Sequence, residues 1–311
     1  MRQKGLLFIY VLLTFSMLFW GTSFVFTAAL LPVLDPISII FIRLVISSVL
    51  LWLFVLLFFR KQRLSKPLWK WVFLMAFFEP FIYFLGETYG LQRVSPTVVS
   101  LIIATIPVFT AIVMSVFFQA KLSAVNFAGI FISIFGVFCM IVNKDLTLNA
   151  DLIGLLLVFV AVLSTIGYSV ILHKLAKNAS PIWIVTVQNT FGILLFLPLF
   201  LLLRETPNYE NGKVLFAFLS VKETMWFYLI TLAVFCSALA FIFYILAVRK
   251  IGVAKSNVFS NLIPIITAVI SYFLLDERFT IQKITGIAIV IFGLILTQKS
   301  YKHRIEKQNN K

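Results

Sequence analysis

The second half of this chain repeats the landmarks of the first half, and this repeat restricts the possible folds more than any other feature. A constant shift of about 157 residues places segment 89–142 on segment 246–298. Under this shift Pro107 falls on Pro264, and Gly136 falls on Gly293. A shift of about 145 residues aligns the earlier part, and the polar segment 204–223 can absorb the difference. Internal repeats of this kind determine an architecture before local structure does.

The composition indicates a membrane protein. Apolar residues make up 62% of the 311 residues and charged residues only 12%, whereas ordinary globular proteins have about 25% charged residues. A soluble chain of this length could not bury so much apolar surface, so we expect most of it to face a lipid bilayer. The net charge of +15 comes from short basic clusters between apolar runs. This pattern favours positively charged loops over a nucleic-acid partner.

Ten apolar stretches are long enough to cross a bilayer. Their length and continuity favour helices over barrel strands, so the predicted fold is an all-α integral membrane protein with ten transmembrane helices. The first stretch has a basic start but is too long for a cleaved signal peptide, so we expect it to be retained. The predicted spans are 6–30, 36–59, 68–91, 96–118, 123–142, 151–174, 181–203, 224–248, 254–275 and 281–298.

These spans divide into two repeats of five. We expect a first five-helix repeat over 1–145, a second over 146–298, and a basic cytoplasmic tail over 299–311. An odd number of spans per repeat forces the two repeats into opposite orientations in the membrane. The prediction is therefore a pair of inverted five-helix repeats, the plan of many secondary transporters.

The basic residues predict the orientation of the chain. With a cytoplasmic N-terminus, eighteen of the 26 Lys and Arg residues fall on the cytoplasmic side and seven on the outer side, with Arg43 inside a span. Because Lys and Arg near span ends set topology, we expect both termini in the cytoplasm.

Three charged side chains fall within predicted spans. A charge at the centre of a spanning helix costs about 2.5–3.5 kcal/mol, so Arg43, Glu79 and Glu87 are expected to face a partner or a wet cavity. One interpretation is an ion pair that fixes helix packing. The other is that Glu79, which precedes Pro80, binds a proton or cation during transport together with Glu87, while Arg43 orients an anionic group of the solute.

Other polar and aromatic residues could line the same cavity, although each could equally serve in helix packing. Repeat mates among them, such as Ser100 with Asn257 and Gln188 with Arg43, would lie on opposite sides of a central space. The candidate solute contacts are Trp20, Ser23, Arg43, Tyr83, Ser100, Tyr168, Gln188, Tyr244, Asn257 and Asn261, with Glu79 and Glu87 as candidate coupling residues.

The sequence gives no sign of a metal or cofactor. Cys139 and Cys236 lie in apolar runs, and His173 and His303 are scattered, so we expect no disulfide framework, metal site or haem. The chain also has no phosphate-binding glycine loop, which argues against ATP-driven transport by this chain alone.

Several landmarks together carry a family resemblance. They are Trp20-Gly21, Arg43 after Pro36, Tyr89-Gly90-Leu91 leading to Pro107, the repeated Pro264, and Asp276-Glu277-Arg278 before Gly286 and Gly293. In this order the chain resembles the drug/metabolite transporter superfamily, specifically its EamA-type members. The first repeat departs from the family pattern, because Ala120-Lys121 stands where a glutamate is usual.

The resemblance implies a bacterial inner-membrane carrier that works by alternating access and commonly exports amino acids, metabolites or toxic organic compounds. It implies a small-molecule solute as partner and no enzymatic activity. A membrane-embedded enzyme or a flippase for lipids or lipid-linked precursors stays open as an alternative. Substrate, coupling ion, direction of flux and oligomeric state do not follow from the resemblance, because the family spans many solutes.

Overall fold

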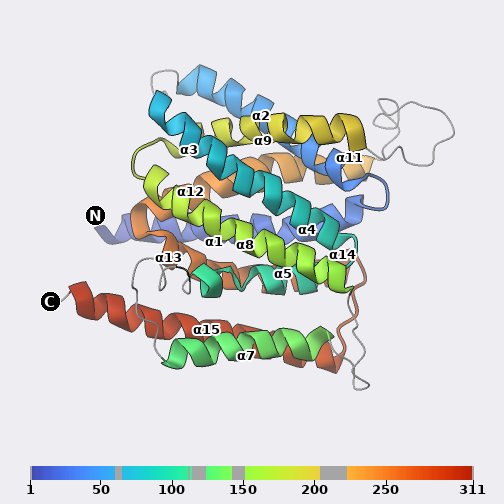
Figure 1. The fold of residues 1–311 in the computed structure, drawn as a ribbon, viewed down its shortest axis with the longest axis vertical. Coiled ribbons are helices and arrows are strands. Elements are labelled where there is room, and N and C mark those ends of the chain that lie inside the picture. The colour runs from blue at the N-terminus through green and yellow to red at the C-terminus, as the bar shows by residue number, and fades with distance from the viewer. Residues whose placement is uncertain are drawn as a thin grey trace.

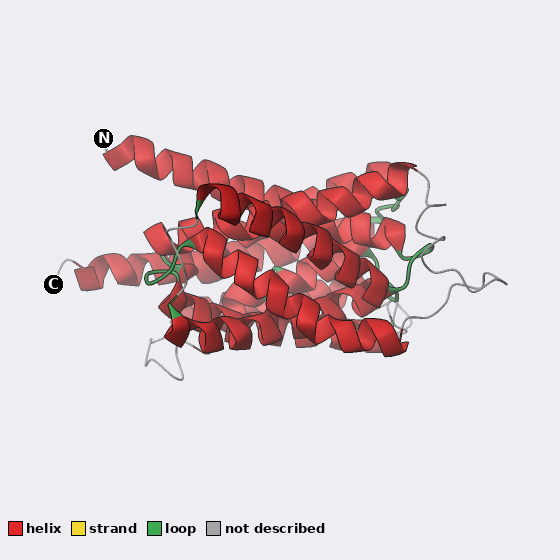
Figure 2. Cartoon of the chain, turned by 90° about the horizontal axis from the view of Figure 1, so that it is seen from above, coloured by secondary structure: helices red, strands yellow, loops and turns green. Residues whose placement is uncertain are grey.

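The computed structural model describes residues 2–59, 65–110, 113, 124–141, 151–203 and 223–309. Over these residues the chain forms helices and no strands. Figure 1 shows the helices lying side by side with their axes roughly aligned, and Figure 2 shows that the connecting loops gather at the two ends of this bundle. The predictions that involve Ala120, Lys121 or the polar segment 204–222 concern residues outside the described ones.

Four long helices are continuous: α1 (Arg2–Leu30), α2 (Pro36–Phe58), α8 (Leu152–Leu175) and α9 (Pro181–Leu203). Three further stretches contain a change of helix type. They are α3–η1–α4 (Lys66–Ala76, Phe77–Ile82, Tyr83–Leu91), α11–η2–α12 (Glu223–Thr231, Leu232–Leu239, Ala240–Ile251) and α13–η3–α14 (Val253–Asn257, Val258–Asn261, Leu262–Leu274). The remaining helices are α5 (Pro96–Ile103), α7 (Ala124–Ile141) and α15 (Ile281–Asn309).

Seven helices among the described residues are long and apolar enough to cross a membrane, and all seven fall on predicted spans. Three shorter apolar helices cover Pro96–Thr110, Phe127–Cys139 and Ile281–Leu296. Over the described residues, the expectation of an all-helical fold with helices of membrane-spanning length is therefore confirmed. Helix α15 continues to Asn309, so most of the predicted tail extends the last helix.

Local sequence explains where several helices begin. Pro36 opens α2, and Asp35 accepts a hydrogen bond of 2.9 Å from the Ser38 N–H. Asp151 caps α8 in the same way, at 2.7 Å from the Ile153 nitrogen. Such caps satisfy N–H groups that have no partner within the helix. Since the turns after α1, α4 and α8 are short, consecutive helices there run antiparallel.

Helices α7 and α15 form a close pair along one side of the bundle (Figure 1). A Cβ atom added at Gly136 would lie 2.7 Å from the backbone nitrogen of Val290, and one added at Gly293 would lie 2.5 Å from that of Ser133. Both distances are too short for any side chain. Glycine is therefore required at both positions for the backbones to approach.

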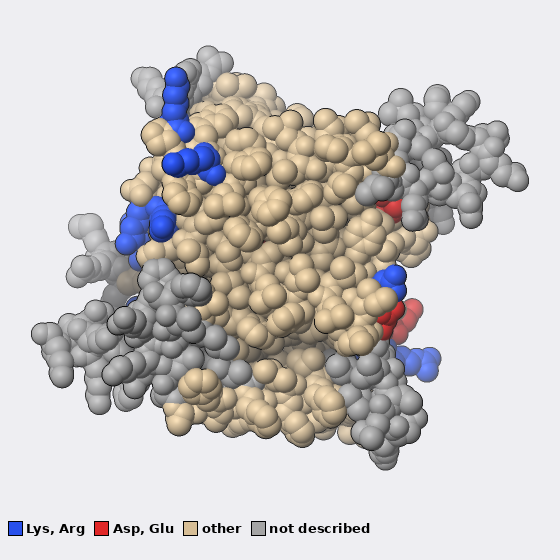
Figure 3. All heavy atoms as spheres, viewed as in Figure 1, with Lys and Arg blue, Asp and Glu red and all other residues tan. Residues whose placement is uncertain are grey.

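The two ends of the bundle differ in charge. The start of α1 and the end of α15 lie at the same end in both ribbon views (Figures 1 and 2). On the face shown in Figure 3, several Lys and Arg side chains lie at this end without acidic neighbours, whereas at the opposite end Lys or Arg side chains lie together with the Asp and Glu side chains. This is the distribution expected of a membrane protein whose two surfaces face different compartments.

Candidate functional site

Two of the helical stretches are interrupted near their middles by π-helical turns, η1 and η2. In η1, Glu79 adopts an extended conformation (φ −143°, ψ 115°) directly before Pro80, which has no N–H to continue the helix. Under the shift of about 157 residues, η1 corresponds to residues within η2. π-Helical turns frequently occur at functional sites, and interrupted helices at matching places in two halves point to the binding site of a transporter.

A cavity of about 60 Å³ lies in the interior beside these interruptions. Its wall combines three charged residues with hydroxyl, amide and aromatic side chains from helices in both halves of the chain. The lining residues are Met17, Trp20, Ser23, Phe24, Arg43, Glu79, Tyr83, Phe84, Glu87, Ile103, Ile106, Thr165, Tyr168, Phe241, Tyr244, Ser256, Asn257, Ser260 and Ile263.

Arg43 enters the cavity wall from α2 and is 1% exposed. Its Nε donates a hydrogen bond of 2.8 Å to the Ser237 hydroxyl, and its guanidinium carbon lies 4.3 Å from the centre of the Phe84 ring. Its Nη1 atom is buried without a hydrogen-bond partner. Arg43 is thus held in place but keeps donor capacity for a ligand.

The carboxyl groups of Glu79 and Glu87 belong to the same wall, and these residues are 6% and 2% exposed. Among the described residues neither carboxyl makes a hydrogen bond or an ion pair with another residue; the ion pairs found there join Arg93 to Asp151 and Lys283 to Glu277. The interpretation that Arg43 and a glutamate form a direct ion pair is therefore not supported by this structure. The three charged groups share one cavity without neutralising each other by contact.

Aromatic rings form another part of the wall. The Trp20 ring centre lies 5.2 Å from the ring centres of Phe241 and Tyr244, and Tyr168 packs at 6.4 Å edge-on against Phe241. The Tyr244 hydroxyl donates a hydrogen bond to the side-chain oxygen of Asn257. Such a wall offers a solute flat apolar contacts together with a few fixed polar groups.

Twelve residues were predicted from the sequence as candidate solute contacts or coupling residues. Nine of them line this cavity: Trp20, Ser23, Arg43, Glu79, Tyr83, Glu87, Tyr168, Tyr244 and Asn257. The other three are not among its lining residues. Ser100 is fully buried and donates to the Thr97 carbonyl oxygen of its own helix at 2.8 Å. Gln188 donates to the Glu79 carbonyl oxygen at 2.8 Å, and Asn261 lies in η3 beyond the wall.

The sequence reasoning missed several lining residues. Thr165 lies one helical turn before Tyr168, so the periodicity of α8 could have found it. Ser256 directly precedes Asn257 at the start of the same polar turn. No comparable signal marks Phe84, because it is one of 35 phenylalanines in a strongly apolar chain.

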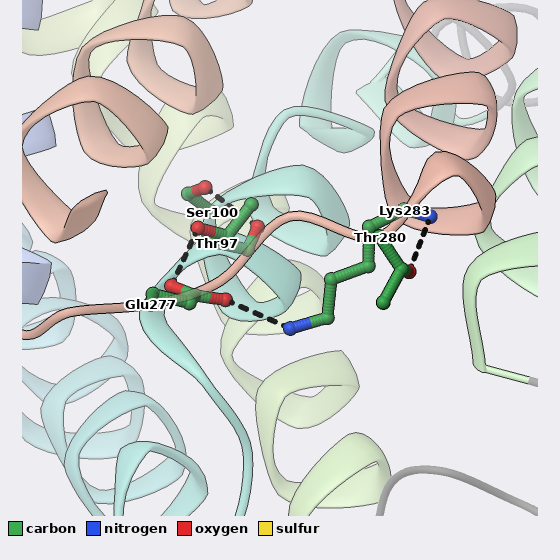
Figure 4. A network of polar contacts seen from close by, with 5 residues as sticks. All are labelled: Thr97, Ser100, Glu277, Thr280 and Lys283. Atoms are coloured by element: carbon green, nitrogen blue, oxygen red, sulfur yellow. Dashed lines mark hydrogen bonds and ion pairs between the residues drawn. The ribbon is translucent and has the colours of Figure 1, made fainter.

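A second polar cluster lies outside the cavity, at the end of the bundle where α14 ends and α15 begins (Figure 4). Glu277 accepts a hydrogen bond of 2.8 Å from the Thr97 hydroxyl and pairs with the Lys283 ammonium at 3.2 Å. Burial alone would raise the pKa of Glu277, but hydrogen-bond donors around the carboxylate, together with Lys283, outweigh it and hold the pKa below its ordinary value. The ionised carboxylate therefore connects α5 to the start of α15.

Comparison with known proteins agrees with this geometry. The model of the EamA-like transporter family matches residues 7–142 and again residues 152–298. The chain belongs to the EamA-like transporter family. The resemblance to EamA-type members of the drug/metabolite transporter superfamily is thereby confirmed, and the protein is a multi-pass membrane protein of a transporter family.

Relatives named as transporters match over most of the chain. The "Uncharacterized transporter YetK" of Bacillus subtilis is 27% identical over 263 residues, which cover 82% of this chain and 76% of the relative. An "Uncharacterized transporter" of Archaeoglobus fulgidus is 23% identical over 287 residues, covering 92% and 97% of the two chains. One solved crystal structure has the same fold, with a TM-score of 0.64 and 14% sequence identity. The superposition covers 95% of this EamA-like chain and 98% of the chain in that structure.

Proposed function

We propose that this EamA-like protein is a secondary active carrier that exports small organic solutes (metabolites, amino acids or drug-like compounds) by alternating access. One observation carries the proposal: Arg43, Glu79 and Glu87 share a buried cavity in which Arg43 Nη1 has no hydrogen-bond partner and, among the described residues, neither carboxyl group forms a direct ion pair. Charged groups buried in a membrane are costly unless something pairs with them. A solute or ion that enters from one side and leaves to the other would meet this need.

The proposed mechanism requires two inverted five-helix repeats, over 1–145 and 146–298. The contacts of α7 with α15 support this arrangement. Gly136 lies against Val290, and Gly293 lies against Ser133; the shift of about 157 residues exchanges the members of one contact for those of the other. A two-fold axis between repeats produces such reciprocal contacts. The seven long and three shorter apolar helices also coincide in order with the ten predicted spans.

We further propose that both termini face the cytoplasm and that the protein lies in the bacterial cytoplasmic (inner) membrane. The shared position of the two ends of the chain and the gathering of Lys and Arg at that end support this orientation (Figures 1 and 3). For coupling we propose Glu79 and Glu87 as the sites where a proton or cation binds. Glu79 lies at the interruption of its helix, where a change in occupancy could be transmitted to the backbone.

A ligand screen tests the proposal. Purified protein is heated with libraries of amino acids, other metabolites and drug-like compounds, and its melting temperature is recorded. A true ligand at about 100 times its dissociation constant contributes about 2.7 kcal/mol, which corresponds to a shift of roughly 5 °C or more. We expect one chemical class to produce this shift in the wild type and not in Arg43→Ala. The matched control, Thr285→Val, changes an exposed hydroxyl on α15 and should respond like the wild type.

The compound found in this way is then followed in proteoliposomes. Saturable counterflow of the unchanged compound supports a carrier. Chemical conversion of the compound would indicate an enzyme instead, and movement of labelled lipid between leaflets without solute exchange would indicate a flippase. A screen in which no compound stabilises the wild type more than Arg43→Ala would contradict the proposed site.

A further inference from the structure

Two adjacent amide side chains on α9 reach the two interrupted helices. Gln188 and Asn189 are 1% and 3% exposed. The Gln188 Nε2 atom donates to the carbonyl oxygen of Glu79 in η1 at 2.8 Å, and the Asn189 Nδ2 atom donates to the carbonyl oxygen of Ser237 in η2 at 3.1 Å. Consecutive residues on a helix point about 100° apart, so one turn of α9 can contact both neighbours.

The backbone at η1 needs such a partner. In a regular helix the Tyr83 N–H would bind the carbonyl oxygen of Glu79, but here it binds those of Phe78 and Pro80. The Glu79 carbonyl is thereby left without its usual donor, and no water replaces it inside a bilayer. Gln188 supplies the missing hydrogen bond. Its own buried side-chain oxygen has no partner, so this contact is the one the amide makes.

The contact at η2 extends to the charged group of the cavity. Ser237, whose carbonyl oxygen accepts from Asn189, uses its hydroxyl to accept the hydrogen bond from Arg43 Nε at 2.8 Å. Asn189 also donates to the hydroxyl of Ser47, one turn after Arg43 on α2, at 2.9 Å. Asn189 therefore fixes both the helix that carries Arg43 and the residue that holds its guanidinium group.

Helix α9 lies close enough to act rigidly on this region. A Cβ atom added at Gly192, one turn after Gln188, would lie 2.6 Å from Cγ of Pro80. The glycine lets the helix surface contact the proline at the interruption directly. Shifts of α9 would consequently move the backbone of Glu79.

We infer that Gln188 and Asn189 form an amide brace that positions Glu79 and Arg43 relative to each other. Neither amide lines the cavity, so both are positioning residues that act through η1 and η2. The inference rests on the proposed function only in treating the cavity as the solute site. It implies that α9, from the second half of the chain, sets the distance between opposite charges contributed by the first half.

Chemical labelling tests the brace without a known solute. Full-length protein in proteoliposomes is treated with dicyclohexylcarbodiimide, which modifies carboxyl groups within membranes, or with 2,3-butanedione, which modifies arginine, and the labelling rates of Glu79, Glu87 and Arg43 are measured by mass spectrometry. Gln188→Met keeps about the same side-chain length and Asn189→Leu keeps the branched shape, and both remove the donor. We expect Gln188→Met to raise the Glu79 rate about threefold or more, and Asn189→Leu to raise the Arg43 rate similarly, as the loss of one hydrogen bond implies.

The crossed pattern separates positioning from general loosening. Gln188→Met should leave the labelling rate of Arg43 unchanged, and Asn189→Leu should leave that of Glu79 unchanged. The labelling rate of Glu87 serves as the internal reference. Thr186→Val on the same helix removes a hydroxyl that binds only its own helix, at the Ile182 carbonyl, and should change none of the three rates. If Asn189→Leu does not fold, Ser47→Ala, which removes the hydroxyl that accepts from Asn189 on α2, should raise the Arg43 rate in the same direction.

Unchanged rates in both variants, or equal increases at all three residues, would overturn the brace. Because labelling reports the position of Glu79 and Arg43 directly, this failure is distinguishable from a failure of the ligand screen, which would leave the labelling pattern intact.

Discussion

At the scale of single residues, Arg43 is held by two neighbours that depend on the shape of the guanidinium group. The Ser237 hydroxyl accepts from its Nε atom, and the Phe84 ring lies beneath its plane. A lysine could carry the same charge but has no Nε donor and no flat surface. Arg43 therefore contributes geometry as well as charge to the cavity.

Arg43→Lys should accordingly fold but bind solute less tightly. We expect about a tenfold loss of affinity for the compound found in the screen, consistent with the loss of a charged hydrogen bond. Titration of the melting-temperature shift against compound concentration measures this loss. Affinity equal to that of the wild type would show that the guanidinium geometry has no part in binding.

Glu79→Gln keeps the shape of the side chain but removes its ability to bind and release a proton. If Glu79 couples transport to protons, uptake driven by an imposed pH gradient should fall at least about tenfold, while counterflow without a gradient should persist. Proteoliposome assays with radiolabelled compound give both rates. Thr285→Val, which changes an exposed hydroxyl outside the cavity wall, is the control and should retain gradient-driven uptake. Undiminished uptake by Glu79→Gln would remove Glu79 from the coupling proposal.

The residues of the cavity were partly predictable because polar groups inside spans are costly and therefore informative. This cost identified Arg43, Glu79 and Glu87 from the sequence. The same energetic argument does not predict the direction in which a side chain points. Ser100 satisfies its hydroxyl on its own helix, and Gln188 satisfies a neighbouring backbone carbonyl, so both fulfil the same physical requirement away from the cavity.

At the scale of helices, Pro80 predicts the interruption at η1, but no residue in the sequence predicts the interruption at η2. The segment Leu232–Leu239 forms π-helical turns without a proline or glycine. Its shape depends on tertiary partners, namely Asn189 at the Ser237 carbonyl and Ser16 at the Ala240 carbonyl. Contacts between segments that lie far apart in the chain are not readable from local sequence, whereas the positions of the spans were.

The close pairing of α7 with α15 makes a stability prediction. Gly293→Ala would place a methyl group within 2.5 Å of the Ser133 backbone nitrogen, so we expect destabilisation of about 1–3 kcal/mol, seen as a lower melting temperature. Phe131→Ala is the control on α7, since this side chain is 73% exposed toward the lipid side and should change stability less. Equal melting temperatures for Gly293→Ala and the wild type would argue against the close pair.

Glu277 predicts a dependence of stability on pH. Because its pKa is lower in the folded protein than in the unfolded chain, its contribution is complete above the ordinary glutamate pKa and is lost as the pH falls through the lower value. Between roughly pH 5 and pH 3, the melting temperature of the wild type should therefore fall more steeply than that of Glu277→Gln. Glu223→Gln, at the start of α11, should follow the wild-type curve. Parallel curves for wild type and Glu277→Gln would contradict the role of the Thr97–Glu277–Lys283 cluster.

At the scale of the whole molecule, the repeat in the sequence and the reciprocal glycine contacts describe the same relation between two halves. The spacing of about 157 residues was visible before any contact was known. The cavity itself was not visible in this way, because its volume depends on how all the helices pack. The charge distribution agrees with this relation, since on the face of Figure 3 the end with Lys and Arg but no acidic neighbours is also the end where α1 begins and α15 ends (Figures 1 and 3).

This arrangement predicts the topology. Fusions of a cytoplasm-active fluorescent reporter and of a periplasm-active phosphatase to either terminus should show both termini in the cytoplasm. A fusion within 31–35, the turn between α1 and α2, should report the opposite side. Termini on opposite sides would mean an odd number of spans and would exclude two five-helix repeats.

The most direct test of the central claim is whether the cavity opens to both sides of the membrane. Ser260→Cys places a thiol in the cavity wall of a protein whose Cys139 and Cys236 are replaced by serine. A membrane-impermeant maleimide is applied to right-side-out and to inside-out vesicles, with and without the compound found in the screen. Alternating access predicts labelling from both sides and protection by the compound. Labelling from one side only, or labelling that the compound does not slow, would contradict the account.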